Sequence, residues 1–133
     1  MTDHLLDSDA VIHLLRGTPA CVAFVEGLRT QGDMLCTSDV VIAKVFSGQH
    51  PEHRAVARRL LGSFSFLPTR PAAAELAGEW RYRYRRQGIQ ISTTDALIAA
   101  TAFIYQVDVV TGNVKDYPMP EITILALPGL DQR

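Results

Sequence analysis

Three aspartates of this sequence stand where an α/β protein would place functional carboxylates. Asp7 follows a short apolar run, Asp95 begins a stretch of helical periodicity, and Asp116 lies in a polar turn after a β-branched run. Sites in open α/β sheets form where parallel strands end and helices begin. The three side chains are therefore expected to meet at one sheet edge, with Asp9 as a weaker fourth candidate.

A cluster of carboxylates at one edge favours a particular chemistry. Like charges repel, and each raises the pKa of its neighbours, so such a cluster is stable only when a cation neutralises it. Hard oxygen ligands suit Mg²⁺ or Mn²⁺. These ions assist phosphodiester cleavage by activating water and by stabilising the charge that develops on phosphorus.

Each aspartate also has a purely structural interpretation, which the sequence alone leaves open. Asp7 or Asp9 is a good N-cap for the helix that follows. Asp95, three residues after Ser92, suits the first turn of a capped helix. Asp116 is typical of a turn before a proline. The functional interpretation depends on the acids acting together.

The elements that must position these acids alternate along the chain. Short apolar segments predict strands at 4–6, 34–37, 64–67, 108–111 and 122–125. Helical periodicity, caps and breakers predict helices at 10–16, 19–29, 40–46, 51–61, 72–86 and 92–105. The strands are short and continuously apolar, so they predict a mostly parallel sheet of about five strands with helices on both faces. The expected fold class is α/β, in a single domain over 1–133.

Composition narrows the functional class. The chain has 133 residues, 47% of them hydrophobic and 20% charged, as is typical of a soluble globular protein. Its apolar runs are too short to span a membrane, and no secretory signal is visible. Cys21 and Cys36 lack metal-site spacing and are expected to be buried, reduced thiols in a cytoplasmic protein.

A basic region breaks the near-neutral charge balance. Between Arg54 and Arg86 the chain has eight arginines and only two glutamates. The run 80–86 alternates aromatic and basic residues, and at helical spacing Arg81 lies beside Arg85. One interpretation is a solvated helix end whose arginines suit the helix dipole. The other is that Arg81, Arg85 and Arg86 contact RNA phosphates or a protein partner.

The blocks that carry these acids resemble a known family. The segments Leu5–Ile12, Gly88–Ala100 and Val110–Pro118 are similar, in order and spacing, to the motifs of PIN-domain ribonucleases, especially VapC-like toxins of toxin–antitoxin pairs. The resemblance implies a three-layer α/β/α fold, a Mg²⁺ or Mn²⁺ site, cleavage of RNA, a homodimer and an antitoxin partner.

The resemblance also implies roles for individual residues. Asp7, Asp95 and Asp116 would be the catalytic, metal-binding acids. The polar residues that support them would be Ser8, Thr111 and Asn113, with Asp9 as a weaker candidate.

One position departs from the family pattern. Where the family has a glutamate early in the third helix, this sequence has Lys44, which moves the local charge by two units. A lysine there would compete with a metal ion by pairing with the aspartates. Three interpretations stay open: Lys44 points away, it takes the cation's place in an inactive relative, or it was introduced to remove toxicity.

Two other functions compete with the metal-dependent endoribonuclease. The first is a catalytically inactive PIN-like binding protein in which Lys44 replaces the metal. The second is a response-regulator-like domain, a class that also gathers acids at this edge and uses a lysine near the position of Lys115. The second fits the surrounding motifs less well.

Overall fold

A computed structural model describes residues 2–130 of the chain. Its centre is a five-stranded sheet in the order β3-β2-β1-β4-β5, in which every pairing is parallel. The strands are β1 (His4–Leu6), β2 (Leu35–Ser38), β3 (Ser65–Leu67), β4 (Asp108–Thr111) and β5 (Ile124–Ala126). This confirms the predicted α/β class with about five short parallel strands.

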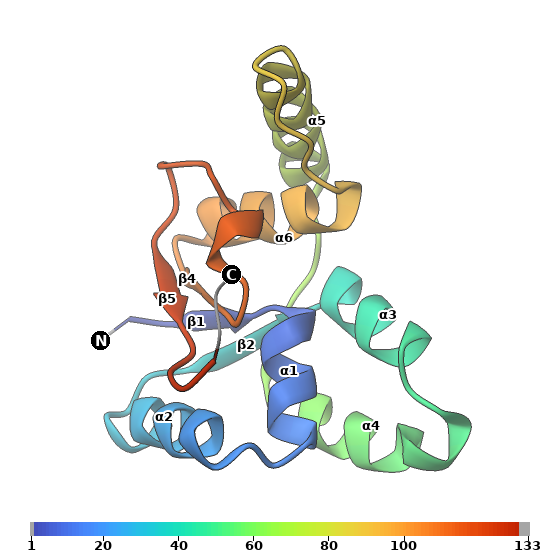
Figure 1. The fold of residues 1–133 in the computed structure, drawn as a ribbon, viewed down its shortest axis with the longest axis vertical. Coiled ribbons are helices and arrows are strands. Elements are labelled where there is room, and N and C mark those ends of the chain that lie inside the picture. Colours follow the sequence, from blue (N-terminus) through green and yellow to red (C-terminus); the bar gives the residue numbers. More distant parts are fainter. Residues whose placement is uncertain (1, 131–133) are drawn as a thin grey trace.

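Helices cover the sheet on both sides. The α-helices are α1 (Ser8–Leu15), α2 (Pro19–Thr30), α3 (Asp39–Ser47), α4 (Arg54–Gly62), α5 (Pro71–Arg85) and α6 (Thr93–Tyr105). Two short 3₁₀ helices are η1 (Pro51–His53) and η2 (Val114–Asp116). Figure 1 shows α5 and α6 above the strands and α2 and α4 below them, as in a three-layer α/β/α fold.

One part of the core lies between the central strands and α6, and the core extends to buried residues of α1, α2, α3 and α4. Leu5 and Leu6 of β1 and Val109 and Val110 of β4 have no solvent exposure, because helices cover both faces of these strands. Against them pack the small and branched side chains of α6, which are Ala96, Ile98, Ala99, Ala100 and Ala102. The continuous apolar runs of the sequence correspond to this doubly covered part of the sheet.

Most element boundaries lie within one or two residues of the prediction, and two elements differ in a way that has a structural cause. The last strand is β5 at Ile124–Ala126 and not 122–125, because Val109 pairs with Ile124 in the parallel register. The helix predicted over 51–61 divides into η1 and α4. Its first turn tightens because the His50 ring accepts a hydrogen bond from the Glu52 amide.

The carboxyl ends of β1 and β4 meet at the point where the strand order changes direction. Leu6 pairs with Val110, and the Asp7 amide donates to the Val110 carbonyl across 3.1 Å. In open α/β sheets this switch point is the usual place for a site.

Within residues 2–130, no single helix combines the length and hydropathy of a membrane span, and α1 with α2 would do so only together, across a bend of 112°.

Candidate functional site

Asp7 is a buried carboxylate with several hydrogen bonds at the end of β1. It is the N-cap of α1, and its Oδ1 accepts from the Ala10 amide at 2.9 Å. The Tyr117 hydroxyl donates to its Oδ2 at 2.9 Å, and the Thr111 side chain gives a further hydrogen bond. Burial raises the pKa of Asp7 to about 6, although these hydrogen bonds lower it. The structural interpretation of Asp7 as a cap is therefore correct, but it does not account for the buried network.

Asp95 stands in the first turn of α6, where the Ser92 hydroxyl caps the helix by accepting from the Asp95 amide. The ammonium of Lys44, from α3, lies 3.3 Å from Asp95 Oδ1. The Asp95 side chain is 15% exposed and that of Lys44 is 34% exposed, so the pair is only partly screened by water. Lys44 thus points toward the acids, and the interpretation in which it points away is wrong.

Asp116 ends η2, in the loop after β4. The Asn113 side-chain amide donates to Asp116 Oδ2 at 2.9 Å, and the Asn113 backbone amide donates to the Thr111 hydroxyl oxygen at 2.9 Å. Thr111 is fully buried and also bonds Asp7. The polar residues Thr111 and Asn113 therefore link the carboxylate after β1 to the carboxylate after β4.

The three aspartates influence one another electrostatically. Burial is the main cause of the raised pKa of Asp116, and the charge of Asp95 raises it further while that of Lys44 lowers it. The pKa of Tyr117 is raised well above its usual value by burial and by the charges of Asp7 and Asp95. The structure thus brings Asp7, Asp95 and Asp116 into one anionic neighbourhood, in which Lys44 and Lys115 are the nearby positive charges.

The fit of a metal ion to this neighbourhood depends on which carboxylate oxygens are available. The donors have the right chemistry for Mg²⁺ or Mn²⁺. Within residues 2–130, however, no three His, Cys, Asp or Glu side chains are grouped so as to hold a metal ion. Both Asp7 oxygens accept hydrogen bonds, and one Asp95 oxygen pairs with Lys44. The side chains therefore do not fit a divalent ion as long as Lys44 pairs with Asp95.

Ser8 and Asp9 flank the cluster at the start of α1. Ser8 is buried as the first residue of the helix. Asp9 is less buried, with 43% of its side chain exposed, and lies 3.6 Å from the His13 ring. Its charge raises the pKa of both Asp7 and Asp116, so it belongs to the neighbourhood without being at its centre.

Two residues of the site were not predicted from the sequence. Tyr117 donates to Asp7 across 110 positions, and only the tertiary register brings the two together. Gly112 lies against Asp9: a Cβ at position 112 would stand 2.2 Å from Asp9 Oδ2 and 2.8 Å from Leu130 Cδ1. The sequence signal for Gly112 was only that of a strand terminator.

Gly112→Ala is expected to destabilise the protein and to displace Asp9. The new methyl group overlaps Asp9 Oδ2 and Leu130 Cδ1, which are the ends of flexible side chains and can shift, so the expected loss is about 1 kcal/mol, the lower end of the range for overpacking. Urea unfolding measures the loss. Gly27→Ala is the matched control, because nothing lies within 4 Å of its Cβ and a helical alanine is favoured by about 0.5–1 kcal/mol. Equal stabilities of the two variants would contradict the close approach at position 112.

The arginines of the α5 end have different roles. Arg81 Nε donates to the Ile91 carbonyl at 2.9 Å, and Arg83 pairs with Glu121 at 2.8 Å. Arg85 and Arg86 are exposed and lie against the Tyr82 ring. Arg81 thus has a structural contact that the sequence did not predict, whereas Arg85 and Arg86 remain available at the surface.

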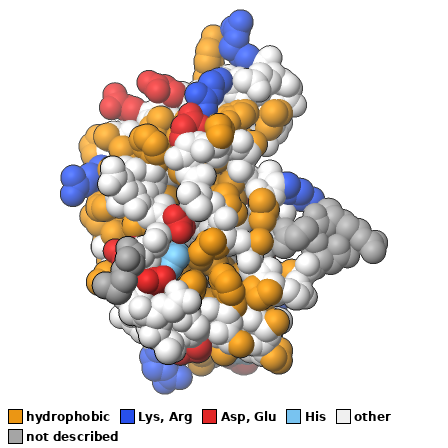
Figure 2. Space-filling model, turned by 90° about the vertical axis from the view of Figure 1, so that its left-hand side faces the viewer, with side chains coloured by type: hydrophobic (Ala, Val, Ile, Leu, Met, Phe, Trp, Pro, Cys, Tyr) orange, Lys and Arg blue, Asp and Glu red, His pale blue; other side chains and the backbone are white. Residues whose placement is uncertain are grey.

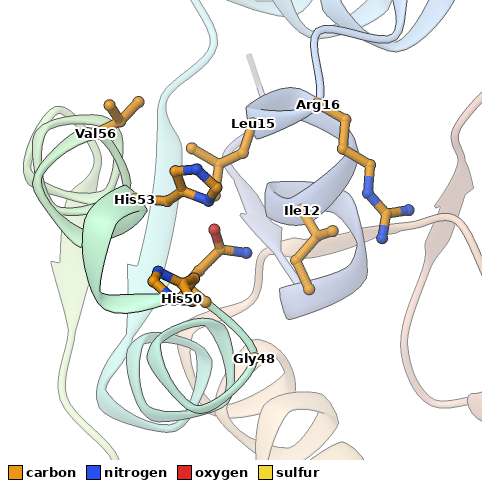
Figure 3. Close-up of a pocket in the computed structure, with 8 residues that line it drawn as sticks. Ile12, Leu15, Arg16, Gly48, His50, His53 and Val56 are labelled. Carbon is orange, nitrogen blue, oxygen red and sulfur yellow. The ribbon is translucent and has the colours of Figure 1, made fainter.

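A cavity of about 520 Å³ lies between α1 and the segment that leads into α4 (Figure 3). Its lining residues are Ile12, Leu15, Arg16, Gly48, Gln49, His50, His53 and Val56. None of the three aspartates lines it. The ring centres of His50 and His53, for which the sequence indicated no functional role, lie 6.1 Å apart at this cavity.

Comparison with known proteins places this arrangement in a family. The family model of the PIN domain matches residues 4–115. The chain is 38% identical to ribonuclease VapC10 of Mycobacterium tuberculosis over 117 residues, which cover 88% of this chain and 87% of that protein. It is 28% identical to ribonuclease VapC19 of the same species over 115 residues, which cover 86% and 92%.

A solved structure agrees with this assignment at the level of the fold. VapBC from Salmonella typhimurium bound to DNA superposes with a TM-score of 0.82 at 22% identity, over 96% of this chain and 99% of that one. The alternation of elements, the parallel sheet and the motif order all agree with these matches. The chain therefore belongs to the PIN-domain family, among the VapC proteins.

Proposed function

We propose that this chain is an endoribonuclease of the VapC toxin type. In its acid cluster, Lys44 pairs with Asp95 and takes the position of a cation. The observation that carries the proposal is the common anionic neighbourhood of Asp7, Asp95 and Asp116 at the sheet edge. It occurs in a chain 38% identical to a ribonuclease. RNA phosphodiesters are the proposed substrate.

The roles of the side chains follow from their contacts. Only with Lys44 displaced from Asp95 would Asp7, Asp95 and Asp116 hold Mg²⁺ or Mn²⁺, which when bound would supply an activated water and stabilise charge on phosphorus. Asn113 orients the Asp116 carboxylate through its amide, and Thr111 fixes Asn113 through the backbone. Tyr117 fixes one oxygen of Asp7. Lys44 neutralises Asp95 and must leave before a divalent ion can take its place.

A second candidate function is favoured by the same ion pair. If the Lys44–Asp95 contact of 3.3 Å persists, the ammonium offsets the negative charge of the cluster in place of a divalent ion. The chain would then bind RNA or a protein partner without cleaving it. The two candidates differ in one measurable property, which is cleavage that depends on a divalent ion.

Cleavage of single-stranded RNA in Mg²⁺ or Mn²⁺ tests the proposal. We expect the native chain to cleave RNA and EDTA to abolish this activity. The cleavage rate of Asp95→Asn should fall by at least about 100-fold, which is typical of removing one group that stabilises charge in the transition state. Asp39→Asn is the matched control, since Asp39 is exposed and hydrogen bonded to Thr69 outside the cluster. Cleavage that persists in EDTA would exclude the proposed mechanism, and an inert native chain would favour the second candidate.

The proposed setting is that of a toxin–antitoxin pair. The solved relative from Salmonella is a VapBC complex, so we propose a cognate antitoxin as the protein partner of this chain. We further propose a homodimer in the cytoplasm. The cavity beside α1, with apolar Ile12, Leu15 and Val56, offers one surface on which such a partner could be sought.

A further inference from the structure

The projecting end of α5 carries an exposed group of one aromatic and two basic side chains. This group, the α5 tip, consists of Tyr82, Arg85 and Arg86, and 56% of Tyr82 is exposed to solvent. Figure 1 shows α5 extending away from the sheet, and Figure 2 shows basic side chains at that end of the molecule.

The other side chains of this helix end have contacts inside the protein. Trp80 and Tyr84 are buried against the core, and the Phe103 ring packs edge-on to Trp80. Arg81 and Arg83 contact the Ile91 carbonyl and Glu121. The buried face and its two flanking arginines thus fix the helix, while the α5 tip faces outward.

The three side chains of the tip contact one another. The guanidinium carbons of Arg85 and Arg86 lie 5.9 and 5.6 Å from the centre of the Tyr82 ring, and Arg86 donates to the Tyr82 hydroxyl at 3.1 Å. Among residues 2–130, neither arginine forms an ion pair with a carboxylate. Within these residues, no carboxylate therefore neutralises their charges.

This combination matches the chemistry of single-stranded nucleic acid. Exposed rings and guanidinium planes stack with bases, and arginines beside them contact the phosphates. We propose that the α5 tip is a binding platform for single-stranded RNA, in which one base stacks on the Tyr82–arginine group and Arg85 and Arg86 each contact the backbone. The inference deepens the proposed ribonuclease function and rests on it.

The tip is connected to the acid cluster through hydrogen bonds between α5 and the start of α6. The Arg81–Ile91 hydrogen bond ties α5 to the residue before Ser92, and Ser92 caps the helix whose first turn carries Asp95. At a rise of about 1.5 Å per residue, Arg85 stands about 6 Å beyond Arg81 along the α5 axis. An RNA strand bound at the tip would thus be held at a fixed offset from the cluster.

Fluorescence anisotropy with a labelled single-stranded RNA, recorded in EDTA on the full chain, measures binding without metal-dependent cleavage. Tyr82→Ala should weaken binding by roughly 5- to 100-fold, the range for loss of one stacked base. Arg85→Ala/Arg86→Ala should reduce the slope of log affinity against log salt by about 1.4, because each phosphate contact contributes about 0.7 on single strands. Tyr82→Phe should retain most of the affinity.

The matched control is Arg54→Ala/Arg59→Ala on α4, which removes the same charge from another exposed basic surface. This double variant should change the salt slope much less than the tip variant does. Equal reductions of the salt slope in the two double variants would show that the whole basic region attracts RNA, and would overturn the assignment to the tip. Unchanged affinity in both Tyr82→Ala and the tip double variant would overturn it as well.

Polyglutamate separates an RNA platform from a contact for acidic proteins. Base stacking requires nucleobases, so Tyr82→Ala should lose affinity for RNA and keep its affinity for polyglutamate. Equal losses for both probes would assign the tip to acidic partners and contradict the proposal. A chain that binds RNA through the tip but never cleaves it would refute the proposed function alone, because the binding assay does not depend on cleavage.

Discussion

Lys44→Glu is expected to raise the affinity of the chain for Mn²⁺ by at least about tenfold and to increase RNA cleavage in parallel. The ammonium lies 3.3 Å from Asp95, and two unit charges about 4 Å apart interact by about 4 kcal/mol at an effective dielectric constant near 20. Exposure of one third of the lysine side chain reduces this value, but tenfold in affinity requires only about 1.4 kcal/mol. Calorimetry of Mn²⁺ binding measures the gain.

Two controls separate removal of the ammonium from addition of a ligand. Lys44→Met removes the charge at similar length, so its Mn²⁺ affinity should fall between those of the native chain and Lys44→Glu. The double variant Lys44→Glu/Asp95→Asn should lose the gain, because the acid released from Lys44 is no longer present. If the native chain already binds Mn²⁺ as tightly as Lys44→Glu, Lys44 does not compete with the ion and the proposed role of Lys44 as a cation of the cluster is wrong.

Asp7→Asn is expected to stabilise the fold near neutral pH while it abolishes cleavage. Burial raises the pKa of Asp7 from 3.8 to about 6, so the folded chain binds a proton more tightly than the unfolded chain does. The stability that this proton provides is complete below about pH 4 and is lost as the pH rises through about 6. The pKa difference corresponds to about 3 kcal/mol, since each unit is about 1.4 kcal/mol.

Urea unfolding in EDTA between about pH 4 and pH 8 tests this expectation. Asparagine does not ionise, yet it is still a good helix cap. The Asp7→Asn variant should therefore be more stable than the native chain by about 1–3 kcal/mol at about pH 8 and equally stable at about pH 4. Tyr117→Phe should have the opposite effect at the upper end, because it removes a donor that stabilises the Asp7 carboxylate. A native stability independent of pH over this range would contradict a buried, ionisable Asp7.

The local elements follow closely from local patterns. Ser92 and Asp95 signal the start of α6 at the sequence level, and the structure has that cap. The apolar runs of β1 and β4 are continuous because these strands are central and covered on both faces. The first residue of the last strand could not be placed from the sequence, since Ile122 and Ile124 are equally apolar and only pairing with Val109 selects Ile124.

Within the site, the residue types of the sequence identified the candidate residues, whereas packing determined which contacts those residues make. Asp7, Asp95 and Asp116 were predicted from the positions of acids next to strand ends and helix starts. The sequence left the direction of Lys44 open, because a helix side chain can turn to solvent or to a neighbour. It also left Arg81 grouped with Arg85, although Arg81 is bound to the Ile91 carbonyl.

The sequence by itself determined the order of strands and helices, the three acids and the family motifs, because these depend on residues close together along the chain. Only the tertiary structure decided that Lys44 neutralises Asp95, that Tyr117 bonds Asp7 and that Gly112 makes room for Asp9. These contacts join residues from separate elements. Their existence depends on sheet register and helix packing, and no local pattern encodes those distances.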